Sequence, residues 1–76
     1  MKVDRSDFME LVSDIATMVV IQRFGEDTFE YVRIFEGHYE TQFTEDAQDF
    51  FNEQYDVIET MIANKLKINL DLLASV

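Results

Sequence analysis

The stretch EDTFEYVRIFEGHYETQF, residues 26–43, decides the fold of this chain because it fits two kinds of secondary structure. On a helical wheel its large apolar residues gather on one face and its polar residues on the other. The apolar set is Tyr31, Val32, Phe35, Tyr39 and Phe43. As a strand, the alternation of apolar and polar residues fails, since Tyr31 and Phe35 share a face with Arg33. The spacing therefore predicts a helix over 28–42.

Gly37 supports the alternative, a β-hairpin over 29–43, because a glycine inside a helix costs about 1 kcal/mol relative to alanine. The choice also decides whether the only histidine of the chain has chemical neighbours. In a strand, Glu36, His38 and Glu40 share one face and could bind a metal weakly. In a helix, residues two positions apart point away from each other. With the helix as the main prediction, we expect no metal and no cofactor.

The segment before this stretch, residues 5–24, predicts a helix more directly. Asp4 or Ser6 can cap its start, and Gly25 can end it. The residues at helical spacing that we expect to face the core are Phe8, Leu11, Val12, Ile15, Met18 and Val19.

The segment after it, residues 45–67, carries a clear apolar stripe, with Thr44 as the expected N-cap. The whole chain then predicts an all-α fold, a single small acidic domain over 1–76. The expected architecture is a compact bundle of three antiparallel helices over 5–24, 28–42 and 45–67, with a short C-terminal helix or extended tail. An α+β fold with the hairpin at 29–43 is the alternative.

The charge balance limits the kinds of partner. Sixteen acidic residues against six basic ones give a formal net charge of −10. Direct binding to nucleic acid or to an anionic membrane surface needs a basic footprint, which this chain lacks, so we expect a basic protein as partner. There is no cysteine for a disulfide, no apolar run of membrane-spanning length and no basic segment of a signal peptide. We therefore expect a cytoplasmic protein.

The acidic residues also form a pattern. No lysine or arginine occurs between Ile34 and Asn64, and four carboxylates repeat along one stripe of the last predicted helix. This stripe is Glu45, Asp49, Glu53 and Asp56, with Glu36 and Glu40 as an extension. We found no catalytic motif, so the sequence predicts no enzyme. The leading hypothesis is a non-enzymatic module that binds and modulates or inhibits a basic protein, by occluding its nucleic-acid-binding site. Small acidic phage inhibitors resemble it in size and charge alone, and the alternative is a stripe that only promotes solubility.

A second apolar set lies roughly opposite the expected core face of the first helix. It comprises Met9, Ala16, Val20, Ile21 and Phe24. One small monomer cannot easily bury both stripes of this helix, so either the C-terminal tail or another subunit is expected to cover the second one. This set predicts an oligomer interface. It supports the alternative function, a structural or assembly protein that works as a helical homodimer.

Overall fold

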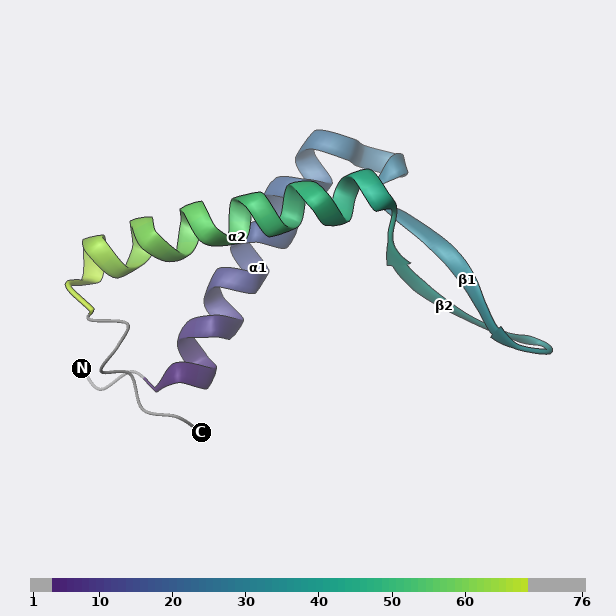
Figure 1. The fold of residues 1–76 in the computed structure, drawn as a ribbon, viewed down its shortest axis with the longest axis horizontal. Helices are drawn as coiled ribbons and strands as arrows, with labels where there is room; N and C mark the ends of the chain where they lie inside the picture. Colours follow the sequence, from purple (N-terminus) through teal and green to yellow (C-terminus); the bar gives the residue numbers. More distant parts are fainter. Residues whose placement is uncertain (1–3, 69–76) are drawn as a thin grey trace.

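The computed structural model describes residues 4–68 and arranges them as two antiparallel helices joined by a β-hairpin (Figure 1). In chain order the elements are α1 (Arg5–Phe24), the 3-10 turn η1 (Gly25–Asp27), β1 (Phe29–Phe35), β2 (His38–Phe43) and α2 (Glu45–Leu66). The hairpin projects from the end of the helix pair where α1 finishes and α2 begins. The described residues therefore have an α+β fold.

The expected all-α bundle of three antiparallel helices is wrong. Helices are present over the first and last expected segments, but residues 28–42 contain strands β1 and β2 instead of a helix. The two strands pair antiparallel, so the alternative, an α+β fold with a hairpin at 29–43, describes the chain better. The expected C-terminal helix or tail lies, from residue 69 onward, outside the described residues.

Gly37 and a β-bulge shape the hairpin. Gly37 has φ of 77° in the two-residue connection between Phe35 and His38, a left-handed conformation that glycine adopts readily. The register shifts between Arg33 and Phe35, which is a bulge. A bulge inserts one residue without a partner, so Phe35 changes to the other face of the strand. Phe35 then pairs with His38 on the face that also holds Glu30 and Glu40, so apolar and polar residues remain mixed on both faces of the hairpin.

The register gives the hairpin two different faces, because directly paired residues lie on the same face of a sheet. One face holds the pairs Phe29–Phe43, Tyr31–Thr41 and Arg33–Tyr39. The other holds the pairs Glu30–Gln42, Val32–Glu40 and Phe35–His38. We call the first the aromatic face of the hairpin. The Phe43 ring lies 5.2 Å from that of Phe51 on α2, so this face packs against the helix at its base.

Two threonines fix the root of the hairpin. Thr28 is fully buried, and its hydroxyl donates to the Gly25 carbonyl at 2.7 Å. The Thr44 backbone N–H donates to the Thr28 carbonyl at 3.0 Å, and the Thr44 hydroxyl donates to the Asp27 carbonyl at 2.8 Å. Thr44 Oγ1 also accepts from the Ala47 N–H, so the residue caps α2 as expected. The direction in which the hairpin leaves the helices is thus set by hydrogen bonds at its base.

The buried side of α1 differs from the one expected. Asp4 caps the helix through the Asp7 N–H, but the buried residues follow a four-residue repeat. They are Phe8, Val12, Ala16 and Val20. Leu11 and Met18, expected in the core, are exposed. Helices that pack along their i, i+4 ridges cross at an angle, so the line of contact winds around each helix instead of following one stripe.

The core lies along the seam between α1 and α2. Phe8, Val12 and Ala16 pack with Ile58 and Ala63, and half-buried apolar residues surround them. At the other end of the seam the rings of Phe24 and Phe50 meet edge to face, with centroids 5.7 Å apart. Ala16 and Ala63 are both buried in this seam.

The molecule is thin for its length. Its radius of gyration is 15.1 Å and its extents are 45 × 26 × 16 Å, whereas a compact domain of 76 residues has a radius of gyration of about 11 Å. Within residues 4–68 the helix seam and the pairing of the two strands are the main internal interfaces, and many large apolar residues of the helices and the hairpin are exposed. None of the helices in this range has the length and apolar character needed to cross a bilayer.

Candidate functional site

His38, the only histidine, lies at the start of β2 and stacks on Phe35 across the hairpin, with ring centroids 4.1 Å apart. Glu36 is in the turn, and Glu40 follows His38 on the same face of β2. Within residues 4–68, no three histidine, cysteine or acidic side chains are placed to hold a metal ion together. The hairpin therefore exists without the three-residue cluster that the sequence suggested for it.

The predicted acidic stripe lies on the outer side of α2. Its four residues, Glu45, Asp49, Glu53 and Asp56, are all exposed, while the buried residues of this helix face α1. Glu36 and Glu40, the predicted extension, lie in the turn and within β2, so the structure separates them from the stripe.

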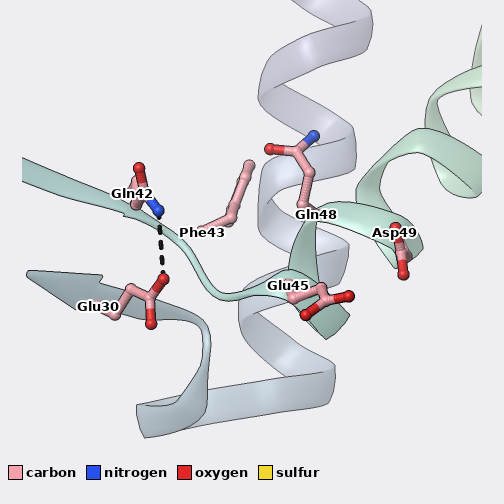
Figure 2. Close-up of a pocket in the computed structure, with 6 residues that line it drawn as sticks. All are labelled: Glu30, Gln42, Phe43, Glu45, Gln48 and Asp49. Carbon is pink, nitrogen blue, oxygen red and sulfur yellow. Dashed lines mark hydrogen bonds between the residues drawn. The ribbon is translucent and has the colours of Figure 1, made fainter. Parts of the chain in front are cut away.

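The structure adds a carboxylate that the sequence reasoning missed. Glu30 on β1 accepts a hydrogen bond from Gln42 Nε2 at 3.2 Å, and both residues line a shallow hollow of about 300 Å³ at the base of the hairpin (Figure 2). Glu45 and Asp49 line the same hollow from α2, together with Phe43 and Gln48. Only the strand register, which pairs Glu30 with Gln42 beside the start of α2, could have indicated this grouping.

The predicted oligomer interface does not form one surface. Ala16 and Val20 are fully buried beneath α2, whereas Met9 and Ile21 are exposed. Phe24 is half-buried against Phe50 at the end of the seam. The winding contact line between the helices divides the set, because Ala16 and Val20 lie on it, Phe24 lies at its end, and Met9 and Ile21 lie to its sides.

A different apolar surface is exposed on the helix pair. Leu11 directly precedes buried Val12 on α1, and Val57 directly precedes buried Ile58 on α2. Each exposed residue is therefore rotated by about 100° from its buried neighbour in the same sense. Because the helices are antiparallel, this rotation brings both exposed residues to the same side of the pair.

Met61, one turn after Val57, extends this surface. Leu11, Val57 and Met61 are 44%, 58% and 53% exposed, and we call them the helix-pair face. Their apolar side chains flank the core seam on one broad side of the molecule.

The aromatic face of the hairpin is a second exposed apolar surface. Phe29, Tyr31 and Tyr39 are 43%, 80% and 61% exposed, although they are large rings on one face. Arg33 is also exposed and lies between them, opposite Tyr39. Phe29 stacks on Phe43 with centroids 5.2 Å apart, which continues the ring contacts from the hairpin to α2.

Comparisons with protein-family models, curated proteins and solved structures found no match to this chain. The arrangement of the exposed surfaces is therefore the basis for the functional argument that follows.

Proposed function

We propose that this chain is a non-enzymatic assembly protein that works as a homo-oligomer, its copies meeting through the helix-pair face of Leu11, Val57 and Met61. The observation that carries the proposal is the thinness of the molecule, which leaves this apolar face without cover from the described residues. Contiguous exposed apolar residues on a small domain commonly mark a protein–protein interface. We further propose that the chain acts in the cytoplasm, as expected from its sequence.

The size of the molecule supports an interface on this side. A specific interface buries about 800 Å² on each partner. The broad side of the molecule measures 45 × 26 Å, so it has room for a contact of that size. In a two-fold dimer the same face is used by both copies, so three residues supply both halves of the apolar contact.

Paired charge substitutions test the assembly proposal. Leu11→Asp with Val57→Asp puts a carboxylate on each helix within the proposed interface, and we expect monomers by light scattering at concentrations where the wild type is oligomeric. Ser6→Asp with Thr60→Asp adds the same charge at exposed positions on the same two helices, outside the helix-pair face, and should leave the molar mass unchanged. A wild-type chain that stays monomeric at millimolar concentration would overturn the proposal.

A second candidate function is the binding of a basic protein by the acidic stripe of α2. The observation that favours it is the hollow in which Glu30 joins Glu45 and Asp49 beside the Phe43 ring. Three carboxylates around one aromatic ring form a surface suited to a basic side chain. In this function the chain would modulate its partner by covering the partner's nucleic-acid-binding site.

Charge reversal on α2 tests the second candidate. Asp49→Lys with Glu53→Lys should abolish capture of a basic partner that the wild type releases at moderate salt. Glu10→Lys with Asp14→Lys is the matched control, because these exposed residues have the same i, i+4 spacing on α1 and the same change in charge. Equal capture by both variants would exclude the stripe as the binding surface.

A further inference from the structure

The aromatic face of the hairpin packs on a helix at its base but not farther out. At the base, the Phe43 ring lies 5.2 Å from that of Phe51 on α2. Tyr31 and Tyr39 lie farther along the same face and are mostly exposed, because the hairpin projects beyond the helix pair (Figure 1). Since the inner end of this face contacts an apolar helix surface, the surface that suits its outer end is a second one of the same kind.

The hairpin is long enough to lie across a second helix pair. The seven residues of β1 span about 23 Å. Two packed helices have axes about 8–10 Å apart and side chains that extend beyond them, so the pair is about 20 Å wide. A two-stranded hairpin is marginally stable in water by itself, so a contact along its exposed rings would also stabilise it.

The helix-pair face is an apolar helix surface of this kind, and its flanks are acidic. Residues three or four positions apart are neighbours on a helix surface. Three exposed carboxylates have this spacing from Leu11 or Val57, and one base, Lys65, has it from Met61. The carboxylates are Asp7, Asp14 and Glu53. The surroundings of the helix-pair face are therefore negative.

The aromatic face has the opposite local charge. Arg33 is the only charged residue among its paired positions, whereas Glu30 and Glu40 belong to the opposite face of the hairpin. This part of an acidic chain is thus locally positive. Two uncovered surfaces of the same chain are complementary, because rings with one cation match aliphatic side chains flanked by carboxylates.

We propose that the aromatic face is the docking surface for the helix-pair face of a second copy of this chain. In a two-fold dimer this contact occurs twice. The helix-pair face of each copy is then covered partly by the helices and partly by the hairpin of the other copy. Tyr31 and Tyr39 pack beside the apolar side chains, and Arg33 lies against the carboxylates that flank them. The inference rests on the proposed homo-oligomer and names the residues that extend its interface.

The area of a stable interface supports a contribution from the rings. A specific interface buries about 800 Å² on each partner, and the three residues of the helix-pair face supply only part of it. A tyrosine can bury about 150–250 Å². Tyrosine and arginine are also residue types that often dominate the binding energy of interfaces.

The net charge of −10 on each copy opposes this association but does not prevent it. Salt screens the repulsion between whole molecules, whereas Arg33 meets the flanking carboxylates directly at the interface. The repulsion between two such chains exceeds the attraction of one cation on each, so self-association is still expected to increase with salt.

Two exposed rings on opposite faces of the hairpin provide a matched test. Tyr39 on the aromatic face is 61% exposed, and Phe35 on the other face is 60% exposed. We expect Tyr39→Ser to raise the dimer dissociation constant about tenfold or more, because the ring is buried twice in each dimer. Phe35→Ser should leave the constant within about twofold of wild type. Sedimentation equilibrium measures the constants, and circular dichroism checks that each variant is folded.

Charge substitutions test the role of Arg33 and keep the proposal testable if a ring variant does not fold. Arg33→Glu should weaken dimerisation about fivefold. Adding Asp14→Lys with Glu53→Lys should restore it, because the charges of the contact are then exchanged. Adding Glu26→Lys with Asp27→Lys instead gives the same net charge but places it in η1, outside both surfaces, and should restore less.

Three results would overturn the proposal. These are equal dissociation constants for Tyr39→Ser and Phe35→Ser, equal restoration by the two lysine pairs, and a dimer that persists in Leu11→Asp with Val57→Asp but is lost in Tyr39→Ser, which would indicate that the hairpins pair with each other. Loss of the dimer in Leu11→Asp with Val57→Asp, but not in Tyr39→Ser, would retain the proposed function and reject the hairpin contact. A wild type that stays monomeric at millimolar concentration would reject both.

Discussion

At the scale of single residues, Gly37 sets the turn of the hairpin. Its φ of 77° closes the two-residue turn, and a Cβ built at this position meets no atom within 4 Å. A substitution there would therefore destabilise the chain through the unfavourable backbone conformation and not through a steric clash with a neighbouring residue. Residues with a Cβ are disfavoured in the left-handed region, but asparagine is tolerated better than most.

We expect Gly37→Ala to destabilise the hairpin by about 1 kcal/mol and Gly37→Asn by less. Hydrogen exchange of the β1 and β2 amides measures the effect, which should be small for the amides of α1 and α2 because the hairpin meets the helices mainly at its root. Equal exchange in the two variants would show that the left-handed conformation of residue 37 does not limit the hairpin.

The ionisation of Tyr55 makes the stability of the fold depend on pH in the alkaline range. Burial raises the pKa of the Tyr55 phenol above its ordinary value of 10.0, and the nearby carboxylates of Glu59 and Asp56 raise it further. The unfolded chain therefore loses this proton at a lower pH than the folded chain does. The associated stability is fully present below pH 10 and is lost as the pH rises through the folded pKa.

The free energy of unfolding should accordingly decrease as the pH is raised above about 10, and Tyr55→Phe should flatten that decrease. Urea denaturation at a series of pH values between neutrality and the alkaline limit of folding measures both slopes. The comparison is between slopes, so a constant stability difference at neutral pH does not affect it. Identical slopes would assign the alkaline dependence to other groups.

At the scale of the elements, two adjacent residues of one helix can differ completely in burial. Ile58 is 3% exposed in the seam, whereas its neighbour Val57 is 58% exposed on the helix-pair face. Both are β-branched apolar residues of the same helix, so their difference in burial comes from the position of α1 alone.

We expect Ile58→Ala to cost about 2–5 kcal/mol of unfolding free energy and Val57→Ala less than about 0.5 kcal/mol. A chain of 76 residues has a total stability of roughly 4–11 kcal/mol, so the Ile58 variant should be close to unfolding. Urea denaturation below the concentration of self-association gives both values. A large loss in Val57→Ala under these conditions would mean that Val57 is buried within the monomer.

The elements also show what could be predicted from the sequence. The helices over 5–24 and 45–67 and their caps Asp4 and Thr44 follow from local signals, namely apolar spacing and side chains that accept backbone hydrogen bonds. The hairpin was not the main prediction because apolar and polar residues do not alternate along β1, where Arg33 shares a face with Tyr31 and Val32 shares one with Glu30. Gly37 was the one local signal in its favour, and β-branched and aromatic residues around it agree with a strand.

The candidate surfaces were predictable to different degrees. An acidic helix face can be read from spacing, so Glu45, Asp49, Glu53 and Asp56 are exposed on α2 as a stripe. The grouping of Glu30 with this stripe depends on strand register, which the sequence did not provide. The aromatic face depends on the same register, because it assembles rings from both strands.

At the scale of the whole molecule, the charge of −10 acts on a thin body of 45 × 26 × 16 Å. Raising the salt concentration from about 0.01 M to about 1 M shortens the Debye length from about 30 Å to about 3 Å. At the lower concentration the carboxylates repel one another across most of the molecule and between copies. At the higher concentration only neighbouring charges interact.

Sodium chloride should therefore raise the midpoint of thermal unfolding and increase self-association, while it weakens the binding of a basic peptide. Light scattering and thermal scans at fixed protein concentration measure the first two effects. Chloride is used instead of sulfate because sulfate also strengthens apolar burial. Self-association that decreases with salt would indicate contacts between unlike charges, contrary to an apolar interface.

The sequence by itself determined the two helices, their caps and the acidic character of the chain, because these depend on residues a few positions apart. The tertiary structure decided which apolar residues are buried. The crossing of α1 and α2 places Ala16 and Val20 in the core and leaves Leu11 and Met18 exposed. It also decided the form of residues 29–43, since strands are stabilised by partners across the hairpin, which the pattern along the chain does not reveal.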